Sequence, residues 1–250
     1  MSARQIWMVL PAYNESENLP AVINGLNKVA SNVYNLKLSI ILVNDGSTDN
    51  TTEVARKHSN GLELEVYENE RNLGLATTFK RGMLIAAKKA GPDDIIFCMD
   101  ADNSHSTGLI PRMICGIEEG RDVIIASRYQ HGAVVKGVPL FRCFLSWSMS
   151  IIFRLIYPIR AVRDYSCGYR AYRAEFLQKA LDAYGEDLFV GEGFSCMAGI
   201  LLSLSREGAI CGEVPIVLRY DQKAGTSKMN VIKTIWQTVK MLLQARFRAK

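Results

Sequence analysis

Residues 94–102 read Asp-Ile-Ile-Phe-Cys-Met-Asp-Ala-Asp, an apolar run that ends in two carboxylates. The run has the length and composition of a buried strand, and similar runs occupy residues 6–10, 38–43, 62–67 and 123–126. Helix-like stretches separate them at residues 18–29, 50–58, 75–90 and 108–118. Strands that alternate with helices of this length are typical of βαβ units. The sequence therefore predicts a Rossmann-like α/β fold with a mainly parallel sheet flanked by helices.

Polar residues gather where the predicted strands end. The first strand runs into Pro11-Ala12-Tyr13-Asn14-Glu15, and the second runs into Asn44-Asp45-Gly46-Ser47-Thr48-Asp49. In open α/β sheets, ligands bind beyond the carboxyl ends of the strands. We therefore expect these two segments and Asp100-Ala101-Asp102 to meet at one edge of the sheet and to form the functional site.

The composition is that of a globular protein in a reducing compartment. The chain has 250 residues, of which 48% are hydrophobic, enough for one large domain with a full core. Its six cysteines are scattered, without a Cys-x-x-Cys pair or zinc-type spacing to a histidine, so neither a disulfide framework nor a zinc site is expected. No secretion signal is visible at the N-terminus, and we expect a cytoplasmic protein.

The positive charge is concentrated in two segments. The net charge is +5, and residues 129–163 and 223–250 contain Lys and Arg but no Asp or Glu. Such segments indicate anionic partners, namely phosphates, nucleic acid or lipid head groups; the alternative is ordinary solvated helix faces with a basic tail. Aliphatic residues rather than stacking aromatics accompany the basic ones, so no nucleic-acid role is expected.

Two apolar helices are predicted in the second half. Residues 140–157 are apolar around Arg142 and Arg154, and residues 231–247 form an amphipathic helix with a basic side. Neither segment has the pattern of a transmembrane helix. We expect a catalytic domain at 1–229, with a membrane-facing helix at 140–157, and a basic C-terminal helix at 230–250. The protein would then be peripheral at the inner face of a membrane; packing of the C-terminal helix on the domain or on another subunit is the alternative.

The strand-end residues suit a nucleotide and a metal. Asp100 and Asp102 can hold a hard divalent cation that bridges a diphosphate, although any turn can carry two aspartates. Asp45-Gly46-Ser47 can hydrogen-bond a base or ribose, or can cap the next helix. Tyr13 and Glu15 can hold a nucleobase, or Glu15 can merely start a helix.

Together these motifs carry a family resemblance. The chain resembles the inverting family 2 glycosyltransferases, and most of all the dolichol-phosphate mannose synthase-like branch, which moves a sugar onto a polyprenyl phosphate. The resemblance covers residues 5 to about 230. It rests on Pro11-Ala12-Tyr13-Asn14-Glu15, Val43-Asn44-Asp45-Gly46-Ser47-Thr48-Asp49, Asn72-Leu73-Gly74, Asp100-Ala101-Asp102 with His105, Ser127-Arg128-Tyr129 and Gly225-x-Ser227-Lys228.

The resemblance implies a GT-A fold and a set of roles. The donor is a nucleotide-sugar, GDP-mannose or a UDP-sugar, and the cofactor is Mg²⁺ or Mn²⁺, held by Asp100 and Asp102. Arg128 and Arg142 complete the catalytic set, and they and Lys228 meet phosphates of donor or acceptor. The residues implied to bind the substrates are Pro11, Ala12, Tyr13, Glu15, Val43, Asp45, Asp100, Ala101, Asp102, Arg128, Arg142 and Lys228.

Two positions depart from the family pattern. A polar metal contact two residues after Asp102 falls on Ser104, which is a short and weak ligand. A basic residue six positions before Lys228 is replaced by Gln222, so that Lys223 or Arg219 would have to substitute. The geometry of the metal site and the acceptor contacts are therefore left open.

A phosphate acceptor would set the mechanism. Its second pKa is about 6, so it is largely deprotonated at neutral pH and needs no general base. Positive charge is needed to hold two anions in line, a task for Arg128, Arg142 and Lys228. Tyr165, Ser166 and Tyr169, which lie near Asp164 in the sequence, are expected to shape the acceptor entrance. The alternative for Asp164 is that it is a structural partner of Arg170.

Other functions remain open at this point. A soluble family 2 transferase that acts on a sugar or protein hydroxyl would need a catalytic carboxylate, and the candidates are Asp164, Asp187 and Glu192. A non-catalytic nucleotide-sugar-binding module is the third interpretation, against which the intact Asp100 and Asp102 argue. A transmembrane partner protein or a homo-oligomer is compatible with all of these.

Overall fold

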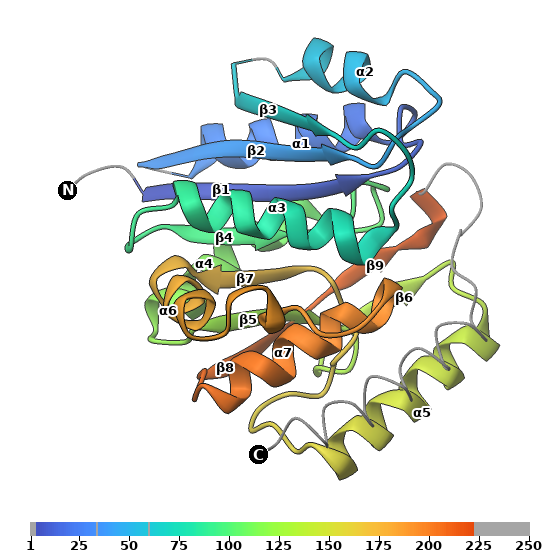
Figure 1. Ribbon diagram of the computed structural model, residues 1–250. Coiled ribbons are helices and arrows are strands. Elements are labelled where there is room, and N and C mark those ends of the chain that lie inside the picture. The colour runs from blue at the N-terminus through green and yellow to red at the C-terminus, as the bar shows by residue number, and fades with distance from the viewer. Residues whose placement is uncertain (1–3, 34, 60, 223–250) are drawn as a thin grey trace.

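The computed structural model describes residues 4–33, 35–59 and 61–222, apart from the side chain of Phe194. A seven-stranded sheet in the order β3-β2-β1-β4-β7-β5-β8 forms its centre (Figure 1). All pairings are parallel except those of β7, which is antiparallel to both neighbours. This confirms the mainly parallel sheet. The strands are β1 (Arg4–Ala12), β2 (Leu36–Asn44), β3 (Glu63–Glu68), β4 (Ile95–Cys98), β5 (Val123–Ser127), β7 (Arg170–Arg173) and β8 (Cys211–Pro215).

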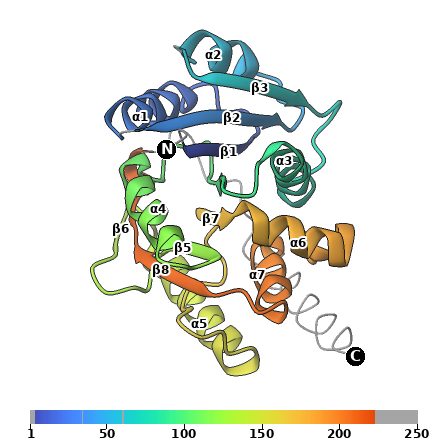
Figure 2. The same ribbon diagram turned by 90° about the vertical axis from the view of Figure 1, so that its left-hand side faces the viewer.

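Helices cover both faces of this sheet. Figure 2 shows α3, α6 and α7 on one face and α1 and α4 on the other, which confirms the flanking helices. The close approach of α3 depends on Gly82, where an added Cβ would lie 2.4 Å from Cγ1 of Val9 on β1. The helices are α1 (Leu19–Asn32), α2 (Thr51–His58), α3 (Leu75–Lys89), α4 (Ile110–Glu118), α6 (Ala174–Tyr184) and α7 (Cys196–Arg206).

A small second sheet joins two loops near the carboxyl edge. It pairs β6 (Val134–Lys136) with β9 (Val217–Arg219) in parallel. His105 forms an isolated bridge with Leu218, and the amide of Arg219 donates to the carbonyl oxygen of Ser104 at 2.9 Å. Thus β9 anchors the loop that follows Asp102. Short 3-10 turns lie at Thr107–Leu109, Gly185–Leu188, Gly193–Ser195 and Tyr220–Gln222.

Helix α5 (Leu140–Ile156) lies apart from the sheet, as Figure 1 shows. Ser150 and Phe153 face inward and are buried. Much of the remaining surface of the helix is apolar and exposed, although no helix in the described ranges is long and apolar enough to cross a membrane. The exposed apolar residues, which we call the outer face of α5, are Leu140, Phe141, Phe144, Trp147, Ile152, Leu155 and Ile156.

The expected elements of the first half appear with shifts of a few residues at their ends, and the helix expected at 140–157 is α5. The strands β7 and β8 and the helices α6 and α7 were not assigned from the sequence. Lys223, Lys228 and the predicted C-terminal helix at 230–250 lie outside the described residues.

Candidate active site

The three polar segments meet at one edge of the sheet, as expected. Ala12 at the end of β1 pairs with Asn44 of β2, and Val9 of β1 pairs with Cys98 at the end of β4. The amide of Asp45 donates to the carbonyl oxygen of Ala12 at 2.8 Å. The central strands β2, β1 and β4 therefore carry their following loops side by side, which is where an open α/β sheet binds ligands.

Hydrogen bonds join the loops after β1 and β2. The Asn14 amide donates to Oγ of Ser47 at 2.9 Å, and the Thr48 amide donates to Oδ1 of Asn14 at 2.8 Å. Glu15 lies shortly before α1, and its carbonyl oxygen accepts from the amides of Asn18, the N-cap residue, and Leu19, the first residue of the helix. Both interpretations of Glu15 and the nucleobase contact of Tyr13 therefore stay predictions.

Asp45 holds a neighbouring loop. Its carboxylate accepts from Nδ2 of Asn69 and from the amides of Leu73 and Gly74 at 2.8–2.9 Å. Gly46 has a φ of +66°, and an added Cβ there would lie 2.5 Å from the carbonyl carbon of Arg71. These two residues therefore fix the loop at 69–74, a structural role that the sequence did not reveal. A ribose contact of Asp45 stays a prediction.

The Asp100-Ala101-Asp102 segment is held from both sides. Asp102 and Ala101 are buried, whereas the Asp100 side chain is 37% exposed. Asp102 Oδ1 accepts from the amide and hydroxyl of Ser104 at 3.1 and 2.6 Å. Nδ1 of His105 accepts from the Asp100 amide at 3.3 Å, and the His105 ring stacks on Tyr169. Ser104 thus orients Asp102, and His105 supports the loop.

This donor set fits a cation shared with a substrate. In the described ranges, no group of three or more His, Cys, Asp or Glu side chains is placed to enclose a metal. Mg²⁺, however, is usually held by one or two carboxylates together with water and substrate phosphates. Asp100 and Asp102, one partly exposed and one oriented by Ser104, meet this requirement if a diphosphate supplies further oxygens.

A cavity of about 230 Å³ connects Asp100 to α5. Its polar lining includes Asp100, His105, Arg128, Arg142 and Ser166. Part of its apolar lining comes from α5 and α7, and includes Met149, Phe153, Met197 and Ala198. The lining of one cavity therefore has both a charged part, which includes Asp100, and an apolar part.

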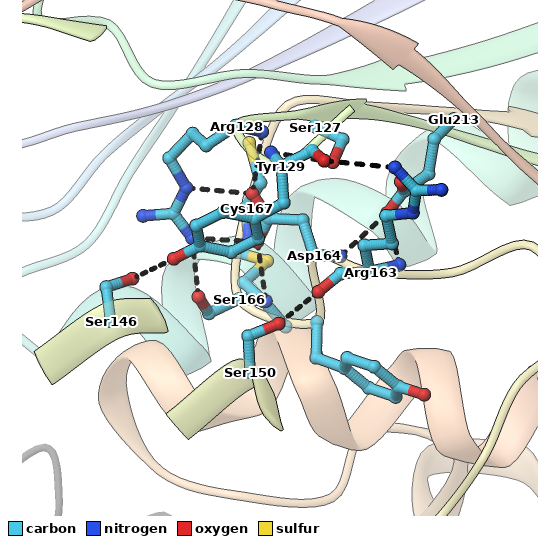
Figure 3. A network of polar contacts seen from close by, with 12 residues as sticks. Ser127, Arg128, Tyr129, Ser146, Ser150, Arg163, Asp164, Ser166, Cys167 and Glu213 are labelled. Carbon is cyan, nitrogen blue, oxygen red and sulfur yellow. Dashed lines mark hydrogen bonds and ion pairs between the residues drawn. The ribbon is translucent and has the colours of Figure 1, made fainter. Parts of the chain in front are cut away.

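Arg128 and Asp164 form an ion pair at this cavity (Figure 3). Nε and Nη2 of Arg128 donate to the two oxygens of Asp164 at 2.8 and 2.7 Å. The suggested pairing of Asp164 with Arg170 is therefore wrong. Arg170 is fully buried and donates to the carbonyl oxygens of Met197 and Tyr165 at 2.6 and 2.8 Å.

Arg142 reaches the same cavity from α5, and within the described ranges its side chain has no hydrogen-bond acceptor or ion-pair partner. The structure thus brings Asp100, Arg128 and Arg142 together. Asp187 and Glu192, two candidate catalytic carboxylates, are not among the residues that line the cavity. Tyr165 and Tyr169 are buried and do not line this cavity, whereas Ser166 does, so a role of the two tyrosines at an acceptor entrance stays a prediction.

The last described residues bear on the two family departures. Gln222 ends a 3-10 turn, and Arg219, one suggested substitute, pairs its guanidinium with Asp221 at 2.8–3.1 Å. An exposed ion pair of this kind contributes little to stability, so the substitution by Arg219 stays a prediction.

Comparison with known proteins places this site in a family. The profile described as "Glycosyl transferase family 2" matches residues 7–181. Polyprenol monophosphomannose synthase of Mycolicibacterium smegmatis is 31% identical over 89% of this chain and 80% of its own length. Dolichol-phosphate mannosyltransferase of Pyrococcus furiosus is 30% identical over 70% of this chain. The matched region is about half (47%) of the length of that relative. Undecaprenyl-phosphate mannosyltransferase of Micrococcus luteus is 27% identical over 90% of this chain and 88% of its own length.

Solved structures share the fold at lower identity. Glucosyl-3-phosphoglycerate synthase from Mycobacterium tuberculosis, in complex with Mn²⁺, uridine-diphosphate-glucose and phosphoglyceric acid, superposes with a TM-score of 0.67. The two chains are 19% identical over 97% of this chain and 79% of the other. A structure of the same enzyme with Mg²⁺ and uridine-diphosphate gives a TM-score of 0.66 at 20% identity, over 97% and 79% of the two chains. The likeness confirms the GT-A fold.

Proposed function

The chain belongs to glycosyl transferase family 2 and is a glycosyltransferase, and we propose that it transfers a sugar from a nucleotide-sugar to a polyprenyl phosphate. The donor is GDP-mannose or a UDP-sugar, the transfer inverts the anomeric configuration, and the reaction depends on Mg²⁺ or Mn²⁺. Relatives named for polyprenol, dolichol-phosphate and undecaprenyl-phosphate substrates, at about 30% identity, support this choice of acceptor.

One observation carries the proposal, namely the cavity with two chemically different parts. Asp100, Arg128 and Arg142 form the charged part of its lining, and Met149, Phe153 and Met197 belong to the apolar part. A molecule with a phosphate head and a hydrocarbon tail matches both parts. A sugar hydroxyl acceptor would leave the apolar part without a matching group, and burial of apolar surface is a main source of affinity.

On the donor side, Asp100 and Asp102 would hold the cation, and Ala101 would contact the diphosphate of the donor. When bound, the ion neutralises the charge that develops on the nucleoside diphosphate leaving group. Ser104 keeps the carboxylate of Asp102 in one orientation through two hydrogen bonds. The loops after β1 and β2 contact the nucleotide through Pro11, Ala12, Tyr13, Glu15, Val43 and Asp45.

On the acceptor side, the protein binds and orients a phosphate monoester. Most of this group is a dianion near neutral pH, since its second pKa is about 6, and its oxygen attacks the anomeric carbon opposite the leaving diphosphate. Arg128 and Arg142 offset the repulsion between the two anionic groups. Lys228, which lies outside the described residues, adds to them.

A base-assisted transfer to a hydroxyl has less support. Burial raises the pKa of Asp164, but the charge and hydrogen bonds of Arg128 outweigh it, so that the pKa lies below its ordinary value. A carboxylate of this kind is a weak base and is already engaged by Arg128. Asp187 and Glu192 do not line the cavity.

The outer face of α5 provides the membrane contact. A polyprenyl chain stays in the bilayer, because each CH₂ exposed to water costs about 0.8 kcal/mol, so the enzyme has to come to the lipid. On α5, Phe141 is 70% exposed and Leu155 79%. Lys136, Arg142, Arg154 and Arg160 lie on or near the helix, in a segment without acidic residues. This combination is typical of interfacial helices, and we place it at the cytoplasmic leaflet.

A donor and acceptor screen tests this function. GDP- and UDP-sugars are offered with a short-chain polyprenyl phosphate, and nucleoside diphosphate release is measured. The unphosphorylated polyprenol of equal length is the matched control. Release that needs the phosphate and is strong with one donor supports the proposal. Equal release with the alcohol, or with no acceptor, contradicts it.

A further inference from the structure

We infer that Asp164 is a positioning residue, which holds the guanidinium of Arg128 in one orientation at the cavity, while Arg142 supplies a second charge that no such partner fixes. The inference rests on the proposed phosphate acceptor and assigns different tasks to the two arginines.

The carboxylate of Asp164 is held by a complete set of donors. It has no exposed surface. Oδ2 accepts from the amide and Nε of Arg128 at 3.0 and 2.8 Å. Oδ1 accepts from Nη2 of Arg128 at 2.7 Å and from the amides of Ser166 and Cys167 at 3.2 and 3.1 Å. A buried carboxylate that accepts this many hydrogen bonds stays ionised and has one favourable orientation.

This arrangement fixes the direction of Arg128. Its Nε and Nη2 are bound to Asp164, and Nη2 also donates to Oγ of Ser166 at 2.7 Å. In the described ranges, Nη1 has no acceptor, and the side chain is 21% exposed and lines the cavity. A planar guanidinium that is bound along one edge presents its other nitrogen in a set direction. Arg128 is therefore a directed hydrogen-bond donor.

The backbone that carries Asp164 is fixed as well (Figure 3). Oε1 of Glu213 on β8 accepts from the amides of Arg163 and Asp164, both at 2.6 Å. Oγ of Ser150 on α5 donates to the carbonyl oxygen of Arg163. Hydrogen bonds with β8 and with α5 therefore fix the backbone of this segment. Because Asp164 in turn binds the guanidinium of Arg128, the fold also determines the orientation of Arg128.

Arg142 differs in each of these respects. It lies on α5, is half-buried and lines the same cavity, but no carboxylate in the described ranges binds its guanidinium. A charge without a fixed partner can follow the phosphate as the acceptor enters, and a lysine can do the same. The two arginines should therefore differ in their tolerance of lysine.

The first test uses Asp164→Asn, Arg128→Ala and the double variant. For each, kcat and KM are measured with a short-chain polyprenyl phosphate, together with the Kd of the nucleotide-sugar and the melting temperature. Asp164→Asn should raise the KM for the lipid phosphate at least about tenfold, the lower range for a charge-assisted hydrogen bond, with donor Kd changed less than about twofold. In the Arg128→Ala background it should add almost nothing to KM. A lower melting temperature with an unchanged KM, or additive effects, would show a merely structural role.

The second test leaves the buried carboxylate in place and so does not depend on the folding of Asp164→Asn. Arg128→Lys should raise the acceptor KM at least about tenfold, because an ammonium group cannot bind both oxygens of Asp164. Arg142→Lys should raise the acceptor KM less than Arg128→Lys does, because no carboxylate in the described ranges has to be bound at two points by its side chain. Equal tolerance at both positions overturns the inference.

A third readout separates this inference from the proposed function. In ¹⁵N–¹H spectra, Nε–H of Arg128 should be protected from solvent exchange in the wild type and lose that protection in Asp164→Asn. If the wild-type enzyme does not transfer sugar to the lipid phosphate, the proposed function is wrong, whatever the spectrum shows. If the wild type uses lipid phosphate but Nε–H exchanges freely, only the positioning role is overturned.

Discussion

The hydroxyl of Tyr129 donates to Oγ of Ser146 at 2.9 Å, which ties α5 to the residue that follows Arg128. Ser150, one turn further along α5, binds the carbonyl oxygen of Arg163, the residue that precedes Asp164. The inner side of α5 thus contacts both chain segments of the ion pair, while its outer face is apolar and exposed. The helix that we propose to lie at the membrane therefore also lines the cavity proposed to bind the phosphate.

The metal role of the Asp-x-Asp segment gives the first prediction. Asp102→Asn should lower the rate by at least about 10²-fold, the lower range for the loss of one preorganised electrostatic group. Activity should vanish with EDTA and return with Mn²⁺ or Mg²⁺. Ser104→Ala, which removes only the 2.6 Å hydrogen bond to Asp102, should cost less than Asp102→Asn. Full turnover by the chelated enzyme would contradict the metal role.

Arg142 gives a prediction about the division between donor and acceptor. Arg142→Ala should cripple turnover with lipid phosphate, because a phosphate ligand is lost, while nucleotide-sugar binding measured by calorimetry stays nearly unchanged. Glu192→Gln is the control and should keep most of the rate, since Glu192 does not line the cavity. Loss of donor binding with normal use of the acceptor would show that the phosphate contacts are assigned wrongly.

Glu213 gives a prediction about stability and pH. Burial raises its pKa above the ordinary value of 4.5, and its Oε2 is buried with no hydrogen-bond partner in the described ranges. Between pH 4.5 and the raised pKa, the native state binds more protons than the unfolded state, so this group makes stability fall as pH rises. Glu213→Gln cannot ionise. The difference between the melting temperature of Glu213→Gln and that of the wild type should therefore increase from pH 4.5 towards neutrality. Above the raised pKa this difference should become constant. A constant difference across this range would contradict the assignment.

The outer face of α5 gives a prediction about membrane binding. Leu155→Ser should weaken flotation with anionic vesicles, because a side chain that is 79% exposed would lose its apolar contact with lipid. Ile210→Ser is a matched control, since Ile210 is 59% exposed, lies just before β8 and is not part of α5. Equal loss in both variants, or none in either, would argue against α5 as the contact.

The packing of α3 gives a prediction about the core. Gly82→Ala should destabilise the protein by about 1–3 kcal/mol, the range for overpacking, because its Cβ would lie 2.4 Å from Val9. Gly108→Ala is the control, since the nearest atom to its Cβ is Oγ of Ser106 at 3.5 Å. Urea unfolding of both variants checks this, and equal stability would contradict the close packing.

Local pattern predicted the elements around the site. The strand at 94–99 and its carboxylates were recognisable because an apolar run of strand length ends abruptly in Asp100 and Asp102. β7 was missed because its sequence, Arg170-Ala171-Tyr172-Arg173, contains two arginines, and the fully buried Arg170 does not resemble a core residue. β8 contains Gly212 and Glu213, and both residue types are uncommon in strands, so this strand was not recognisable either.

Contacts between distant residues could not be found in this way. Arg170 lies six positions from Asp164 and was the obvious local partner, whereas the actual partner, Arg128, lies 36 residues away. Likewise, Asp45 binds amides at positions 73 and 74, which only the fold brings near. The sequence predicted Asp100, Arg128 and Arg142 as site residues, and all three line one cavity, but the ion pair that distinguishes Arg128 from Arg142 could be found only in the structure.

The identity of the reaction product tests the central claim most directly. Purified protein is incubated with its preferred nucleotide-sugar and a short-chain polyprenyl phosphate, and the product is examined by ³¹P and ¹H NMR. We predict a phosphodiester between the lipid phosphate and the anomeric carbon, with the configuration inverted relative to the donor. Free sugar alone, or sugar bonded to a hydroxyl while the lipid phosphate stays a monoester, would contradict the account.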